Sequence, residues 1–92
     1  MTQTISIEFE YRQKTYFALV RIKEKQPTEY HVTIMNGALE KRLYGHHIFI
    51  EEEGTFLIGP LPARETGQLR LAIGMALCRH YNKSYHANES TT

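Results

Sequence analysis

Five short segments in the first 58 residues alternate between apolar and polar positions, at residues 5–11, 16–24, 30–36, 46–51 and 55–58. Because successive side chains of a β-strand point to opposite faces, each segment predicts a strand with one buried face. A longer segment, residues 62–81, carries apolar residues at helical spacing. The order predicts an α+β fold: a five-stranded antiparallel meander sheet with one C-terminal helix packed on one face.

The first two segments predict a hairpin whose inward residues match. Pairing Tyr11 with Tyr16 sets Phe9 opposite Ala18 and leaves residues 12–15 as the connection. This register matches the inward-facing residues of the two segments throughout. The type of turn stays open, because neither Gln13 nor Lys14 favours a positive φ.

The last two segments predict a second hairpin around residues 52–54, with Gly54 at a left-handed position. We expect Ile48 and Ile50 to face the core, which places Phe49 opposite Leu57 on the reverse face. Both faces of this hairpin are therefore apolar. A sheet covered by one helix normally shows a polar reverse face, so this pair indicates an exposed apolar area.

Further residues of the predicted outer sheet face strengthen that indication. The face combines apolar, basic and histidine side chains, which we take as a candidate binding surface of the kind that marks interaction sites. Its predicted members are Phe17, Leu19, Arg21, Lys23, His31, Met35, His47, Phe49 and Leu57.

The helix begins either at Pro62 or, with Thr66 as its cap, at Gly67. Its core-facing stripe follows the i, i+3, i+4 rule. The stripe consists of Leu69, Ala72, Ile73, Ala76 and Leu77.

A second side of the same helix carries Leu71, Met75 and Cys78, with Gly74 allowing close approach. A helix that is apolar on two sides requires cover on both, which predicts a homodimer through these four residues. The alternative is cover from the same chain. Residues 39–44, a helical turn with Leu39 and Leu43 four apart, would then fold over the helix.

Length and composition limit the remaining possibilities. The chain has 92 residues, a net charge of +1 and 41% hydrophobic residues, which indicates one folded domain, residues 1–82, with a disordered tail at 83–92. The lone Cys78 excludes an internal disulfide. Neither a signal peptide nor a membrane span is evident, so we expect cytoplasmic residence and no membrane partner.

No sequence motif indicates catalysis, a metal site or a cofactor. His46 and His47 are adjacent and point to opposite faces of a strand, and no pair of histidines or cysteines has the spacing of metal ligands. His31 and His47 remain an alternative site for an anion or a metal across two strands.

The sequence is therefore compatible with three functions. The first is a non-enzymatic homodimeric interaction module that binds a protein through the outer sheet face. The second is a single-stranded nucleic-acid binder, because Arg21, Lys23 and Phe17 combine cations with a ring that stacks on bases. An antiparallel sheet followed by a dimerising helix resembles the arrangement of the Whirly and positive-cofactor families of single-strand binders. The third is a small enzyme with a site at the dimer seam.

Overall fold

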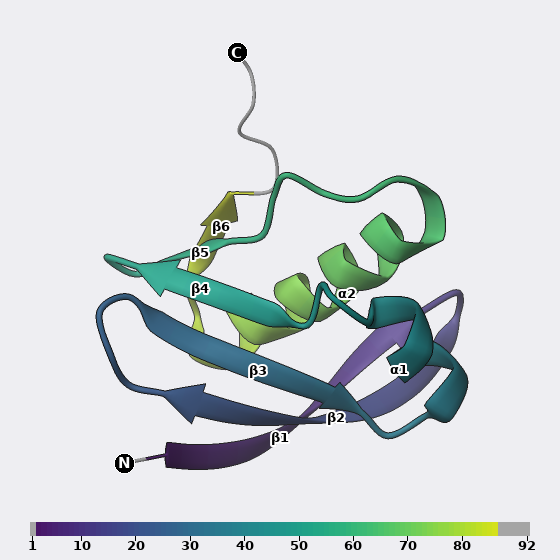
Figure 1. Ribbon diagram of the computed structural model, residues 1–92, viewed down its shortest axis with the longest axis horizontal. Coiled ribbons are helices and arrows are strands. Elements are labelled where there is room, and N and C mark those ends of the chain that lie inside the picture. Colours follow the sequence, from purple (N-terminus) through teal and green to yellow (C-terminus); the bar gives the residue numbers. More distant parts are fainter. Residues whose placement is uncertain (1, 87–92) are drawn as a thin grey trace.

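The computed structural model describes residues 2–86, which form a curled sheet of six strands with two helices (Figure 1). The strands lie in the order β1-β2-β3-β4-β5-β6, and β1 to β5 are an antiparallel meander, whereas β6 runs parallel to β5. The predicted α+β fold with a C-terminal helix on one face of the sheet is confirmed. The elements are β1 (Thr2–Tyr11), β2 (Lys14–Lys23), β3 (Thr28–Ile34), α1 (Gly37–Leu43), β4 (Ile48–Glu52), β5 (Thr55–Leu57), α2 (Arg64–Tyr81) and β6 (Ser84–His86).

The β1–β2 hairpin closes more tightly than expected. Tyr11 pairs with Lys14 rather than Tyr16, and Phe9 pairs with Tyr16. The turn is therefore Arg12-Gln13, and both residues have a positive φ, 54° and 67°. Such mirror-image turns match the twist of the strands they join, although they strain residues other than glycine. The register differs by two residues from our prediction, so the same side chains still face the core.

The β4–β5 hairpin reverses the predicted faces of β4. Phe49 is fully buried and pairs with Tyr30 of β3, so its expected place on the outer face is wrong. Ile48 and Ile50, which we expected to point inward, point outward instead. The turn is Glu53-Gly54, with both residues at positive φ, which is one residue shorter than predicted. Ile48, Phe49 and Ile50 are all apolar, so their sequence does not show which of them face the core. Pairing with β3 determines that Phe49 does.

Helix α2 lies inside the curve of the sheet and supplies one side of the core (Figure 1). The predicted core-facing stripe of α2 is buried. Leu69, Ile73, Ala76 and Leu77 are fully or almost fully buried, and Ala72 is partly buried. The helix begins at Arg64, between the two predicted starts. Short helix α1 is the predicted turn: Leu39 and Leu43 are buried, and the Asn36 side chain accepts a hydrogen bond from the Leu39 amide.

Arg70 connects α2 to the strands beside it. Its guanidinium donates hydrogen bonds to the carbonyl oxygens of Ile58, His46 and Ile48 at 2.7, 2.8 and 3.1 Å. The same group stacks over the Phe49 ring at 4.1 Å. Burial lowers the pKa of Arg70. One side chain thereby satisfies carbonyls where the chain enters β4 and where it leaves β5.

The residues after α2 fold back onto the core, which corrects the prediction of a disordered tail from residue 83. Ser84–His86 form β6 beside β5, and the rest of the predicted tail lies outside the described residues. Lys83 forms an ion pair with Glu51 of β4, and Tyr30 donates a hydrogen bond of 2.6 Å to the same carboxylate. The Tyr30, Phe56 and Tyr81 rings pack together at this end of the core.

Candidate binding surface

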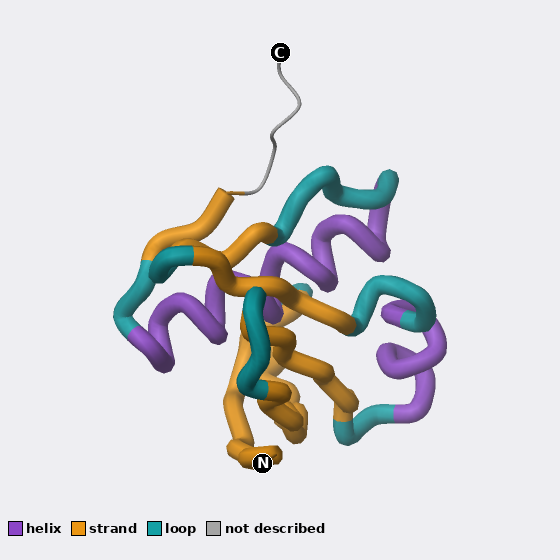
Figure 2. Tube along the Cα trace, turned by 60° about the vertical axis from the view of Figure 1, so that its left-hand side comes forward, coloured by secondary structure: helices purple, strands orange, loops and turns teal. Residues whose placement is uncertain are grey.

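The face of the sheet turned away from α2 is covered by no element within residues 2–86 (Figure 2). Alternation along β2 and β3 nevertheless directs large apolar side chains to it. Phe17, Leu19, Met35 and Ile48 are 51, 42, 60 and 38% exposed. Single exposed apolar residues are ordinary, but a group on one face marks an interaction site. We call these four residues the apolar patch.

Strand pairing brings the patch residues to neighbouring positions. Leu19 lies directly between Ser6 of β1 and Thr33 of β3. The Met35 amide donates a hydrogen bond of 2.9 Å to the carbonyl of Phe17, which places these two residues side by side at the end of the β2–β3 pair. Phe17, Leu19 and Met35 therefore form one continuous apolar area.

Two basic residues continue the same face along β2. Arg21 pairs with His31, and Lys23 pairs with Glu29. The Glu29 carboxylate is already engaged, because one oxygen lies 3.0 Å from the His31 ring and the other 3.4 Å from the Lys25 ammonium. The hydrogen bond with His31, then the Lys25 contact, lowers the pKa of Glu29 despite partial burial. Arg21 and Lys23 form no ion pair within the described residues.

The two histidines of the alternative anion or metal site do lie near each other. The rings of His31 and His47 are 6.3 Å apart and edge to face. In residues 2–86, however, no three histidine, cysteine or acidic side chains form a group that fits a metal ion. Glu29 is the acidic neighbour of His31, and its carboxylate is hydrogen-bonded to the His31 ring.

Most predicted surface residues occur where the sequence placed them. Phe17, Leu19, Arg21 and Lys23 of β2 point outward together with His31, Met35 and Leu57, while His47 is half-buried in the loop before β4. Phe49 is the exception. Sequence reasoning missed Ile48 and Ile50. The length of the β4–β5 turn was the signal, since Glu53-Gly54 as a two-residue turn reverses the phase of β4.

The predicted dimer residues of α2 are mostly occupied by contacts inside the chain. A Cβ on Gly74 would lie 2.3 Å from Cδ1 of Ile58, so this glycine faces the chain's own core. Cys78 is only 6% exposed, and its thiol contacts the Ser84 carbonyl at 3.6 Å. Leu71 is half-buried, and Met75 is 38% exposed. Gly74 and Cys78 are therefore not free to meet a partner helix, because Ile58 packs against Gly74 and residues 83–86 cover Cys78.

A groove separates α2 from the end of β1. Glu8, Glu10 and Phe9 form one wall, and Met75 and Arg79 belong to the other. Neither a histidine nor a cysteine lines this groove, and no ion pair crosses it within residues 2–86. Thr15 and Ala72 complete the lining of the groove.

No protein-family model matches the chain, and neither the curated proteins nor the solved structures yield a match. Among the described residues, no helix has both the length and the apolar character needed to cross a membrane.

Proposed function

We propose that this protein is an interaction module that binds a protein partner through the outer face of β1, β2 and β3. The observation that carries the proposal is the uncovered area formed by Phe17, Leu19 and Met35, all more than 40% exposed on one face. Burying such side chains releases roughly 25 cal/mol for each Å² of apolar surface removed from water. A partner that covers the patch gains this free energy without any change in the fold.

The composition of the patch favours a protein over a nucleic acid. Single strands bind by stacking bases on rings, and Phe17 is the single aromatic residue of the patch. Leu19, Met35 and Ile48 are aliphatic and have no face on which a base stacks. Glu8 of β1 points outward beside Phe17 of β2, and its carboxylate repels phosphate.

The charges beside the patch define the chemistry of the partner. Arg21 and Lys23 follow Leu19 along β2 and lack an internal carboxylate partner within residues 2–86. A matching surface therefore presents apolar side chains next to carboxylates. Such complementarity contributes mainly to association rate and specificity, whereas the apolar contact supplies most of the affinity.

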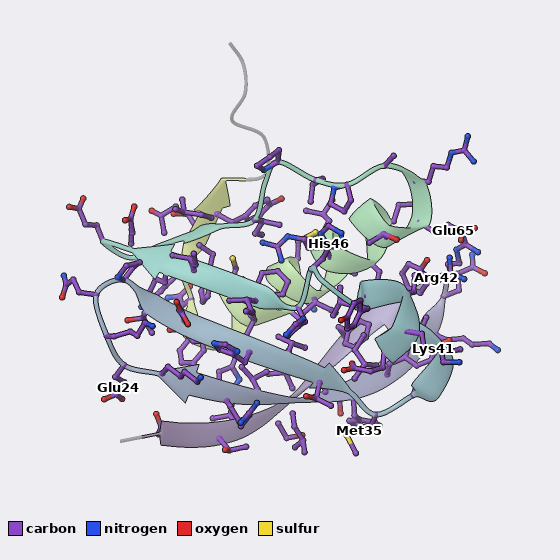
Figure 3. The ribbon with its side chains drawn as sticks, in the orientation of Figure 1. Glu24, Met35, Lys41, Arg42, His46 and Glu65 are labelled. Atoms are coloured by element: carbon purple, nitrogen blue, oxygen red, sulfur yellow. The ribbon has the colours of Figure 1, made fainter. Side chains whose placement is uncertain are left out.

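Site-specific photo-cross-linking tests the proposal. The photoreactive residue replaces Met35 in one variant and Lys41 of α1 in a control; both side chains are exposed and they project in different directions (Figure 3). Cells expressing each variant are irradiated, with the cytoplasm as the expected compartment. We expect a discrete protein adduct from position 35 that is weak or missing from position 41.

A second change separates binding from incidental proximity. Phe17→Ser with Leu19→Ser removes apolar area but alters no charge, and it should abolish the adduct from position 35. An adduct that survives this change, or equal yields from positions 35 and 41, would contradict the proposal. Adducts with nucleic acid that weaken steeply with salt would instead support a single-strand binder.

A further inference from the structure

The outer face carries opposite charges at its two ends. Glu8 and Glu10 point outward in the second half of β1, and Arg21 lies opposite Thr4, in the first half of β1. Lys23 follows Arg21 at the end of β2. Because β1 and β2 are antiparallel, the acidic pair and the basic pair lie at opposite ends of the same two strands. Leu19, opposite Ser6, lies between them.

None of these four charges is neutralised by an ion pair in the described part of the chain. Several charges elsewhere in the described residues are paired. Glu65 of α2 binds both Arg12 and Arg42, Glu51 binds Lys83, and Glu29 is held by His31 and Lys25. The unpaired acidic and basic residues of the outer face are thus left available for contacts with another molecule.

We propose that the partner bound by the outer face is a second copy of this chain; this rests on the proposed function of that face. A two-fold axis that passes near Leu19 places Leu19 of one copy against Leu19 of the other. It also carries Glu8 and Glu10 of one copy toward Arg21 and Lys23 of the other, and the reverse contact follows by symmetry. Packed sheets cross at about 30°, and a crossing of this size brings β1 of one copy over β2 of its partner.

The available area makes this a weak dimer. Strands β1, β2 and β3 have 10, 10 and 7 residues. At about 3.3 Å per residue and about 4.8 Å between strands, they present roughly 430 Å² per copy. Two such areas bury roughly 850 Å², in the range of transient rather than obligate interfaces. Association therefore requires high protein concentration and weakens as salt screens the charges.

A charge-exchange experiment tests the inference. One variant carries Glu8→Lys and Glu10→Lys, and the other carries Arg21→Glu and Lys23→Glu. Sedimentation equilibrium across a wide concentration range measures self-association of the wild type, of each variant and of their mixture. We expect each variant alone to self-associate at least about tenfold more weakly than the wild type, because like charges then face each other. The mixture should recover association, since opposite charges face each other again at both ends.

Loss in both single variants with recovery in the mixture supports the two-fold contact. The two-fold contact is contradicted if the wild type stays monomeric at every concentration. It is also contradicted if both variants self-associate as strongly as the wild type. Failure of the second-copy inference is distinguishable from failure of the binding function, because an adduct of Met35 with a different protein preserves the function. Circular dichroism of both variants verifies that these exposed substitutions leave the fold intact.

Discussion

At the residue scale, two glycines of α2 are fixed by contacts that only the folded chain reveals. A Cβ on Gly67 would lie 2.1 Å from the backbone oxygen of Pro62, which cannot move without shifting the loop before the helix. A Cβ on Gly74 meets a side chain, Ile58, of which the nearest atom is the terminal methyl. The sequence indicated that a small residue was needed at Gly74, but it assigned this glycine to contact with a partner helix.

The difference between these two glycines gives a prediction. Alanine favours a helix over glycine by about 1 kcal/mol, but overpacking costs about 1–3 kcal/mol. Gly67→Ala should therefore lower the free energy of unfolding by up to about 2 kcal/mol, and Ile58→Val should not change that loss. Gly74→Ala should be partly rescued by Ile58→Val, which removes the nearest clashing methyl but keeps Cγ1 at 2.9 Å. Urea unfolding of the two double-mutant cycles measures both couplings, and equal couplings would contradict the assigned contacts.

At the element scale, the meander and both helices were predictable because their signals are local. Alternation in β1 and β2 and the spacing of Leu39 and Leu43 in α1 each specify a buried side. The phase of β4 was not predictable, since Ile48, Phe49 and Ile50 are all apolar. Strand β6 has three residues without alternation, and its pairing with β5 joins segments far apart in sequence. Such pairing depends on tertiary contacts rather than on pattern.

The contact that links β3, β4 and the chain after α2 predicts a pH dependence. Burial raises the pKa of Glu51, but hydrogen bonds from Lys83 and Tyr30 outweigh it, so the pKa lies below its ordinary value. A carboxylate whose pKa is lowered by folding stabilises the protein above its unfolded pKa, about 4.5, and this stabilisation is lost as the pH falls through the folded pKa.

Glu51→Gln should therefore destabilise the protein by about 1–3 kcal/mol near neutral pH, because it leaves Lys83 without its partner. The difference from the wild type should shrink as the pH falls below the ordinary glutamate range. Thermal or urea unfolding at several pH values measures it. A constant difference across the acid range would show that the Glu51 charge contributes nothing to stability.

At the scale of the whole molecule, the sequence indicated more apolar surface than one chain covers. In the structure, most of the exposed apolar surface lies on the outer face of the sheet and not on α2. Residues 83–86 fold back over Cys78, and Ile58 packs against Gly74, so Met75 is the one large apolar side chain of α2 that stays exposed. The outer face keeps Phe17, Leu19 and Met35. The exposed apolar surface of α2 was overestimated, because residues 83–86, which cover Cys78, have no sequence pattern that predicts a strand.

If the outer face serves binding, its apolar side chains should contribute little to folding, and adjacent residues of β2 test this. Leu19 is 42% exposed and Val20 is fully buried. Leu19→Thr should change the free energy of unfolding by no more than about 0.5 kcal/mol, as at other surface positions. Val20→Thr buries a hydroxyl and should cost about 1–3 kcal/mol. Urea unfolding of dilute protein compares them. Equal losses would mean that Leu19 already packs within the monomer, and the apolar patch would then have no free energy to offer a partner.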